Sequence, residues 1–411
     1  MTTAVCQTTP LEWWRHLETF NISHQVGFLL ENPLDHLPGY FLPWEKLGKN
    51  AAQLMASRKL RSEVYKLPLL DFHLLNGQEE YCLAHTLLAT IAHCFVWQDN
   101  DIPKILPKAV AIPWFHISQY LGLNPVYCYL DCVLAMGRKV DPNRELDLSN
   151  LEVICPAPGS PHTDWFSLVL IQVELDFAKG IQDIVDIYDS MDSEDERRLI
   201  LGLKGIENTV RRMQQTTTRM YERLDPAVFY NVLRPFYEGW GAHSKLLPEG
   251  LIFEGISDTP LQFVGGSAAQ SSTIQVLDAV LGVEHSEDAD RYLKQIREYM
   301  PAGHREFLYT VETGPSLKTY VQQSQHDGVK TAYNQCLKAL VDFRTSHLLV
   351  AVDYVLKPSQ NKEERQHHSA QGTGGTNFVS FLKSTRGRTV RSVLQLDGDT
   401  PVVNKELNIN T

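Results

Sequence analysis

An arginine and a histidine lie three residues apart in the apolar segment FRTSHLLVAVDYVL, residues 343–356. Helical steps of three and four residues place Arg344 and His347 on one face. The other members of that face are Tyr333, Leu337, Leu340, Ala351 and Tyr354. A guanidinium keeps its proton when it is buried, so Arg344 requires a nearby anion. A buried His347 must find a partner or stay uncharged.

Two explanations fit this pair. A haem group needs an axial nitrogen ligand and a cation for its propionates, and one helical face would supply both. A core helix with a hydrogen-bonded histidine and a buried Asp–Arg ion pair explains the residues equally well, and Asp278 is the candidate partner of Arg344. Spacing alone leaves both explanations open.

The elements that must position these residues are mainly helical. Apolar residues recur at helical spacing in segments 79–97, 193–213 and 331–356. Ser193 and Glu196 predict a capping box at the start of the second segment, and Pro358 predicts the end of the third. Strand-like alternation is scarce. The sequence therefore predicts an all-α fold.

Two breaks divide this helical pattern. The segment CPAPGSPHTD (155–164) holds three prolines and a glycine, so it cannot continue a helix. It predicts a boundary between a small N-terminal helical domain, residues 1–157, and a large C-terminal helical domain, residues 158–411. The polar, glycine-punctuated segment 358–376 is predicted to be a mobile loop, either a lid over a site or a plain solvent linker.

Composition restricts the partners and the compartment. The 411 residues are 43% hydrophobic and 21% charged, as in ordinary globular proteins, and the net charge of -11 argues against nucleic acid or an anionic membrane as partner. The apolar run 165–175 is too short to span a bilayer. No signal peptide is recognisable, and seven scattered cysteines without a CxxC pair fit reduced thiols, so a cytoplasmic protein is expected.

Several stretches resemble the indoleamine 2,3-dioxygenase family of haem enzymes. They are FRTSH (343–347), FVGGSAAQSS (263–272), GTGGT (372–376), LDPAVFYNVLRPFYEGW (224–240), YLDCVLA (129–135), VGFLLENPLDHLP and REYMPAGHREFL. Each stretch is a weak signal by itself. Their order and spacing from about residue 26 to residue 383 make the resemblance specific.

The resemblance implies haem b, held between helices of the larger domain. Matched motif by motif, His347 corresponds to the proximal ligand of the haem iron. Arg344 corresponds to the arginine that contacts a propionate, and Asp278 to the aspartate that braces it. A backbone strip beside the haem corresponds to Gly266, Ser267 and Ala268.

The resemblance also implies a substrate pocket. Phe229 corresponds to the aromatic side chain that packs on the indole, and Arg234 to the cation that receives the substrate carboxylate. The wall of the distal pocket corresponds to Tyr129, Cys132, Val133 and Phe166. Thr373 belongs to the segment that closes on substrate. Without the resemblance, the aromatic residues would be assigned to the core.

The implied reaction inserts both oxygen atoms of O2 across the indole C2–C3 bond of tryptophan or a related indole. The product is N-formylkynurenine, and the reaction is the first step of the kynurenine pathway of tryptophan catabolism. An electron donor must keep the haem ferrous, and a monomer is expected. Two alternatives remain: a myoglobin-like oxygen-binding protein on the same scaffold, and a signalling protein that keeps haem as a structural or sensing group.

Leu170 departs from the family pattern. Vertebrate members carry a serine there, near the haem-bound oxygen, so this chain lacks that hydroxyl. Loss of one hydrogen bond costs about 0.5–1.5 kcal/mol, at most roughly tenfold in rate. Ser167, one helical turn earlier, is predicted to replace it in part. The predicted catalytic set is therefore Phe229, Arg234, Leu170 and Ser167, with Ala269 and Tyr237 as further departures in the pocket.

Overall fold

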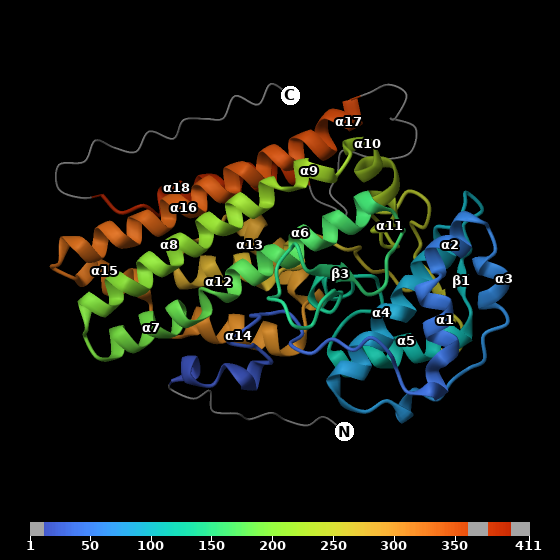
Figure 1. Ribbon diagram of the computed structural model, residues 1–411. Helices are drawn as coiled ribbons and strands as arrows, with labels where there is room; N and C mark the ends of the chain where they lie inside the picture. The colour runs from blue at the N-terminus through green and yellow to red at the C-terminus, as the bar shows by residue number, and fades with distance from the viewer. Residues whose placement is uncertain (1–11, 361–376, 396–411) are drawn as a thin grey trace.

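Helices make up most of the computed structural model, which describes residues 12–360 and 377–395 (Figure 1). The all-α prediction is confirmed. Strands are confined to two small pairs in the described chain. Strand β1 (Ile105–Leu106) pairs in parallel with β4 (Ile252–Phe253), and β2 (Gly137–Lys139) pairs antiparallel with β3 (Leu151–Val153).

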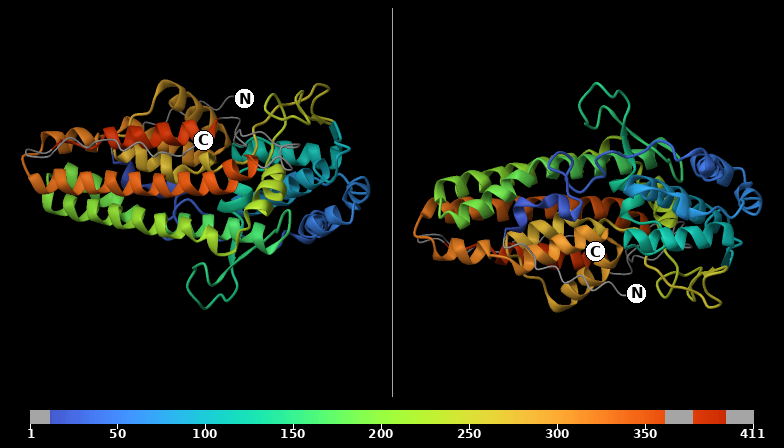
Figure 2. Two further views of the ribbon diagram at one scale, coloured as in Figure 1. Left: turned by 90° about the horizontal axis from the view of Figure 1, so that it is seen from above. Right: turned by 90° about the horizontal axis from the view of Figure 1, so that it is seen from below.

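Five long helices pack along one another at one end of the molecule (Figures 1 and 2). They are α6 (Pro161–Ala178), α7 (Ile181–Asp192), α8 (Glu196–Thr218), α16 (Asp327–Ala351) and α18 (Phe378–Arg391). Helix α8 is central among them, because it contacts α6, α7 and α16. Its apolar residues recur every three or four positions, and Leu199, Leu203 and Ile206 are fully buried. This periodic apolar face explains why α8 lies at the centre of the five helices.

A second group of helices occupies the other end of the molecule (Figure 1). The members are α1 (Leu42–Lys49), α2 (Ala51–Ala56), α3 (Leu60–Val64), α4 (Gly77–Val96) and α5 (Lys108–Leu121). Helix α4 contacts each of the others and is buried continuously from Cys82 to Val96. A helix that is apolar all round belongs in the interior, and α4 is the core of this group.

The remaining helices lie outside these two groups. They are α9 (Met220–Arg223), α10 (Pro226–Val228), α11 (Arg234–Phe236), α12 (Ser272–Val280), α13 (Glu287–Ile296), α14 (Ala302–Thr313), α15 (Leu317–Gln323) and α17 (Lys357–Gln360). Short 3-10 turns are η1 (Trp13–Arg15), η2 (Leu17–Phe20), η3 (Gly39–Phe41), η4 (Phe72–Leu74), η7 (Ala268–Gln270) and η8 (Arg297–Tyr299). Turns of π-helix form at η5 (Leu130–Leu134), η6 (Phe229–Leu233) and η9 (Val352–Leu356). Such turns are rare and frequent at functional sites.

The three predicted helices are present, with corrected ends. Segments 79–97, 193–213 and 331–356 correspond to α4, α8 and α16. The predicted capping box of Ser193 and Glu196 is wrong. The N-cap of α8 is Asp195, whose carboxylate accepts hydrogen bonds from the backbone N–H groups of Arg197 and Arg198. Aspartate is as good an N-cap as serine, and it lies directly before the first helical residue.

The predicted helix end at Pro358 is also wrong. Helix α16 passes into η9 and then into α17, which includes Pro358 as its second residue. Pro358 thus lies within a continuous helical run, just after the π-turn. Residues 358–360 of the predicted loop are therefore helical, and residues 361–376 lie outside the described residues.

The proline-rich segment before α6 is non-helical up to residue 160, as predicted. Ser160 caps α6: its hydroxyl accepts the backbone N–H of Thr163, and the Thr163 hydroxyl accepts the backbone N–H of Ser160. Pro161 is the first helical residue, where its fixed φ suits the helix. This cap sets the start of the helix that carries Phe166 and Leu170.

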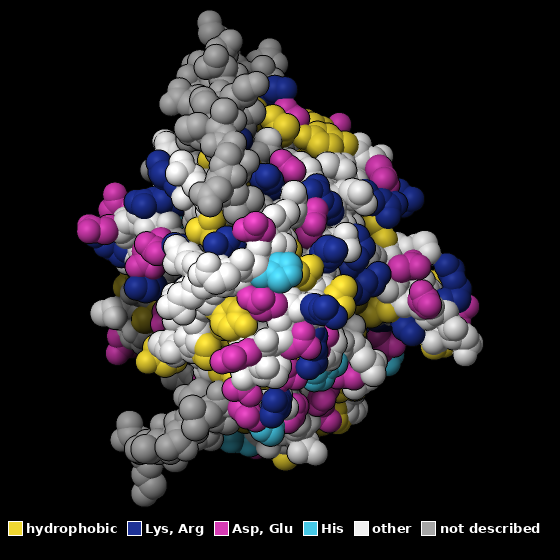
Figure 3. Space-filling model, turned by 90° about the vertical axis from the view of Figure 1, so that its left-hand side faces the viewer, with side chains coloured by type: hydrophobic (Ala, Val, Ile, Leu, Met, Phe, Trp, Pro, Cys, Tyr) yellow, Lys and Arg dark blue, Asp and Glu magenta, His cyan; other side chains and the backbone are white. Residues whose placement is uncertain are grey.

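Charges of both signs and free cysteines are found in the described chain. Acidic and basic side chains are interspersed on the face shown in Figure 3. None of the described helices is both long and apolar enough to cross a bilayer. The described cysteines, 82, 94, 128, 132, 155 and 336, are free and buried.

Candidate functional site

A mainly apolar cavity of about 300 Å³ lies where α6, α12, α16 and α18 converge on η5 and η6. The predicted site residues that line it are Tyr129, Cys132, Phe166, Leu170, Phe229, Arg234, Gly266, Ser267, Ala268, Asp278, Arg344 and His347. These residues span more than two hundred positions of sequence, so folding brings them together. Val133 and Ser167 are buried outside this wall, and Thr373 lies outside the described residues.

His347 extends from α16 into this cavity. Its ring lies deep inside the protein, yet it keeps accessible surface because it borders the cavity. Burial, and then the charge of Arg344, lower the pKa of His347 from its usual 6.5 to about 4. The imidazole is therefore neutral at pH 7. A neutral imidazole can bind a metal ion. The His347 ring makes no hydrogen bond to another described side chain, which distinguishes it from a hydrogen-bonded histidine of the core.

Arg344 is held by a buried ion pair beside His347. Its Nη2 donates to Oδ2 of Asp278 at 2.6 Å, which confirms the predicted pairing. Nη1 donates to the carbonyl of Thr385 and to the hydroxyl of Thr389 on α18. The anion that Arg344 requires is thus present within the protein.

His285 joins this ion pair and was not predicted. Its Nε2 lies 2.8 Å from the Asp278 oxygen that also binds Arg344. Burial would raise the pKa of Asp278, but Arg344 and His285 hold it below its usual value. Asp278 therefore stays ionised and ties α12 to α16 at the wall of the cavity.

Aromatic rings form a slot at the other side of the cavity. The rings of Phe166 and Phe229 lie 5.4 Å apart, and Tyr354 contacts Phe229 edge-on at 5.7 Å. Tyr237 completes the wall, 6.0 Å from Phe166. Phe229 belongs to η6 and Tyr354 to η9, so two π-turns deliver rings to the slot. A flat aromatic ligand suits such a slot, because rings pack well edge-on or offset.

Arg234 places a positive charge in this apolar wall. It is the first residue of α11, is buried, and lies over the Tyr230 ring with 5.3 Å between Cζ and the ring centroid. Burial lowers its pKa, and Tyr230 and Glu238 oppose that shift. A guanidinium remains protonated even so. The cavity therefore combines an aromatic slot with a cation suited to a carboxylate.

Glu174 organises a polar cluster at the cavity wall. Its carboxylate accepts hydrogen bonds from the hydroxyls of Tyr129 at 2.9 Å, Ser271 at 2.7 Å and Thr273 at 2.6 Å. Burial raises the pKa of Glu174, and the three hydroxyls partly oppose this. The cluster ties α6 to η5 and to the start of α12. In the sequence Glu174 only interrupts an apolar run, which is the one signal that could have marked it.

The side chain of Leu170 lines the cavity, whereas that of Ser167 does not. Ser167 lies near the hydroxyl of Tyr237: burial raises the pKa of Tyr237 well above 10, and the Ser167 hydroxyl opposes that shift. Tyr237 also stacks on Tyr127, with ring centroids 5.5 Å apart. The cavity wall thus carries the phenol of Tyr237 and not the predicted Ser167 hydroxyl.

Comparisons with known proteins agree with this geometry. The profile of one protein family, Indoleamine 2,3-dioxygenase, matches residues 16–392. The chain belongs to this family. It is 37% identical to indoleamine 2,3-dioxygenase 1 of Rattus norvegicus, over 94% of this chain and 98% of the relative. It is 34% identical to indoleamine 2,3-dioxygenase 2 of Homo sapiens, over 93% of this chain and 96% of that relative. It is 36% identical to a myoglobin of Haliotis diversicolor, over 91% of this chain and 97% of the myoglobin.

Indoleamine 2,3-dioxygenase family proteins are haem-binding enzymes, and haem is the cofactor of this chain. The residues present fit the group: a neutral imidazole opens onto an apolar cavity beside a buried arginine. Within the described residues, no cluster of three or more His, Cys, Asp or Glu side chains could hold a metal ion. A porphyrin needs no such cluster, because it supplies four ligands itself.

Proposed function

We propose that this chain inserts both atoms of O2 across the indole C2–C3 bond of tryptophan or a related indole, giving N-formylkynurenine. Haem, when bound, supplies the oxygen chemistry, and the protein binds the substrate, orients it and excludes water. The proposal includes an electron donor that keeps the haem ferrous, a monomeric state and a cytoplasmic location. It also includes domains at residues 1–157 and 158–411.

Each side chain has a role in this proposal. His347 would ligate the haem iron, and Arg344, braced by Asp278, would face a propionate. The indole would pack on Phe229, with Phe166 in the adjoining pocket wall and its carboxylate on Arg234. Gly266, Ser267 and Ala268 would border the haem along their backbone, and Thr373 would close over the substrate. Leu170 and Cys132 would keep the slot dry.

The observation that carries the proposal is the buried guanidinium of Arg234 beside the aromatic rings of the cavity wall. A guanidinium in this place can bind a carboxylate through two parallel hydrogen bonds, while the rings pack on the flat part of the same ligand. The carboxylate of an amino acid is such a ligand. A protein that only stores oxygen would have no use for this group.

A second candidate function is oxygen binding without turnover. The myoglobin of Haliotis diversicolor is as similar to this chain as the dioxygenases are. Leu170 favours this function, because a hydrocarbon side chain faces the cavity at the position where vertebrate members of the family carry a serine hydroxyl.

One assay separates the two candidates. Haem-loaded protein is reduced under argon and mixed with air-saturated buffer containing tryptophan, and N-formylkynurenine is followed by absorbance. Product that accumulates over many turnovers supports the dioxygenase. An oxygenated protein whose lifetime is unaffected by tryptophan supports oxygen binding. Omission of the reductant is the control, and it should abolish product in the first case.

A further inference from the structure

A second cavity, of about 440 Å³, lies on the opposite side of η5 from the candidate site. Its walls come from the segment around Phe28, the start of α4, the end of α5 and the start of α14. Cavities of this volume hold small organic molecules in other proteins. None of the residues assigned to the haem or to the indole lines it.

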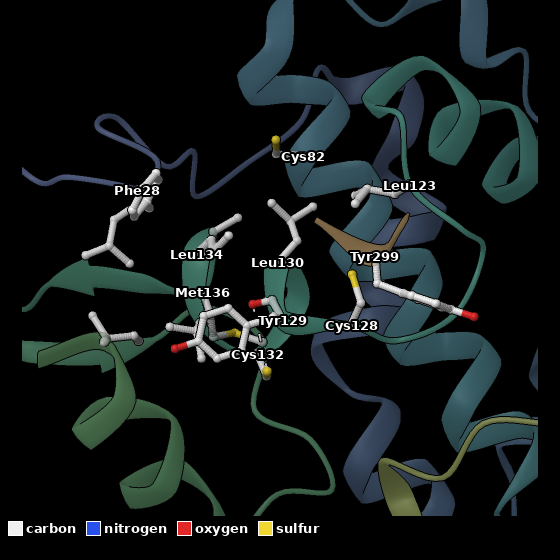
Figure 4. Packing of buried hydrophobic residues seen from close by; sticks show 14 of the residues in the cluster. Phe28, Cys82, Leu123, Cys128, Tyr129, Leu130, Cys132, Leu134, Met136 and Tyr299 are labelled. Atoms are coloured by element: carbon white, nitrogen blue, oxygen red, sulfur yellow. Dashed lines mark hydrogen bonds between the residues drawn. The ribbon is translucent and has the colours of Figure 1, made fainter. Parts of the chain in front are cut away.

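The π-turn η5 is the partition between the two cavities. Leu130 and Leu134 line the second cavity, whereas Tyr129 and Cys132 line the first. Figure 4 shows Leu130 and Leu134 pointing toward the side that holds Phe28, and Tyr129 and Cys132 pointing the opposite way. A single helical turn therefore presents side chains to both cavities.

Buried polar contacts make this turn a unit. The carboxylate of Asp131 lies 2.7 Å from Nδ1 of His85 and accepts the hydroxyl of Thr86 at 3.2 Å and the backbone N–H of Cys128 at 2.9 Å. Tyr129 is tied to Glu174. These bonds anchor η5 to α4 and α6, so the side chains that face the two cavities belong to one tightly held turn.

The charges of the second cavity favour a cation. Glu18, Glu31 and Glu79 line it, and no lysine or arginine does so in the part of the chain that the structure describes. Phe28, Leu123 and Leu130 are buried and give the same cavity an apolar part. The lining therefore suits a molecule with a positive end and an apolar body.

A buried imidazole belongs to the wall of this cavity. His304 lies 4.8 Å from the Phe28 ring, and its Nδ1 is enclosed within the protein. Burial lowers the pKa of His304 to about 3, so the ring is neutral at pH 7 and does not repel a cation.

We propose that the second cavity binds a small organic cation with an apolar body, of the arylalkylamine class. Its occupation shifts η5 and so changes the affinity of the first cavity for its indole. The binding of the cation is independent of the proposed function, whereas the coupling rests on it.

Calorimetric titration of the haem-loaded protein tests the site. The probe is 2-phenylethylamine, compared with the uncharged 2-phenylethanol and the anionic 3-phenylpropanoate. The amine should bind one to one and at least fivefold more tightly than the alcohol, with the anion weakest, and without a change in the Soret band. Equal affinities of the three probes would overturn the proposal.

Substitutions of lining residues test whether the amine binds in the second cavity. Glu79→Gln should weaken amine binding at least threefold, and Asn32→Trp, at an exposed lining position, should block the cavity and abolish binding. Glu249→Gln, an exposed glutamate that does not line the cavity, is the matched control and should leave the affinity unchanged. Amine binding that survives both lining substitutions contradicts the site.

Measuring the affinity for each ligand in the presence of the other tests whether the two cavities are coupled. A saturating amine should change the tryptophan Kd of the ferric protein at least twofold, and tryptophan should change the amine Kd by the same factor. If the amine binds but leaves the tryptophan Kd unchanged, the proposed coupling is wrong, whereas the proposed amine site remains supported. If tryptophan does not bind at all, the proposed function and the coupling fail together, whereas the amine site stands on its own titration.

Discussion

Substitution of the single residue Arg234 tests the substrate pocket. Arg234→Ala removes the buried cation that we assign to the substrate carboxylate. Loss of one member of a buried charge pair costs about 2–5 kcal/mol, roughly thirtyfold to a few thousandfold in Kd. Tryptophan titration of the ferric protein should show this loss, with the haem spectrum retained. Arg234→Lys, which keeps the charge, should recover part of the affinity, and unchanged turnover at low tryptophan would reject the role.

Leu170 tests how much the missing hydroxyl matters. Leu170→Ser restores a polar group to the cavity wall, and Leu170→Ala is the control that shortens the side chain without adding one. One hydrogen bond is worth about 0.5–1.5 kcal/mol, so turnover should rise by no more than about tenfold. A thousandfold rise in the initial rate of N-formylkynurenine formation would show that a hydroxyl at this position is essential.

Some of these residues could be identified from sequence and others could not. Helical spacing placed His347 and Arg344 on one face, and the resemblance to the family assigned Asp278 as the partner of Arg344. Glu174, His285 and Tyr237 were not assigned roles. The partners of Glu174 are 45, 97 and 99 residues away along the chain, so only the packing of α6 against η5 and α12 reveals them.

The hydrogen bonds of Glu174 join α6 to η5 and to the start of α12, so substituting Glu174 tests the contacts among these elements. Glu174→Gln keeps the shape but replaces one accepting oxygen by an amide NH2 that cannot accept the surrounding hydroxyls. A buried group left without its partner costs about 1–3 kcal/mol. Urea unfolding should show a decrease of this size in the free energy of unfolding. Glu222→Gln is the control: Glu222 is 46% exposed and pairs with Arg219 at the surface, where ion pairs contribute little. Equal stability of the two variants would contradict the role of Glu174.

Helices were easier to predict than their ends and irregular turns. The periodic apolar faces of α4, α8 and α16 follow directly from sequence. Their ends depend on which of several polar residues reaches the free backbone N–H groups, and Asp195 rather than Ser193 does so in α8. The π-turns η5, η6 and η9 have no sequence signature, yet η5 and η6 carry or adjoin the predicted pocket residues Tyr129, Cys132 and Phe229.

At the scale of the whole molecule, buried neutral histidines predict how stability depends on pH. His93 accepts the backbone N–H of Tyr127 on Nε2, and its Nδ1 lies 2.9 Å from the carbonyl of Phe236. Burial lowers the pKa of His93 from its usual 6.5 to about 4, despite the opposing carbonyl. Unfolding therefore takes up a proton between those values, and the free energy of unfolding should decrease as pH falls from 6.5 to 4. Each such histidine contributes up to about 1.4 kcal/mol per pH unit.

Urea unfolding at several pH values measures this slope. His93→Gln should reduce the slope within the window, because glutamine does not titrate. His24→Gln, at an exposed position, should leave it unchanged. A slope that is the same in all three proteins would contradict the assignment of His93 as a neutral buried group.

The candidate site is assembled from elements that are far apart in the sequence. Its walls come from α6, α12, α16 and α18 and from η5 and η6, and none of the described residues of α1–α5 lines it. The sequence predicted the fold class and most of the wall. It could not predict the second cavity, because that space depends on how the segment around Phe28 packs against α4, α5 and α14.

The central claim is that His347 is the protein ligand of the haem iron. Purified His347→Ala, compared with the exposed-residue control His24→Ala, tests it most directly by absorbance and pigment content. The account predicts that His347→Ala loses the normal Soret band and most of its haem, while the control keeps both. An unaltered Soret band and a normal haem content in His347→Ala would contradict it.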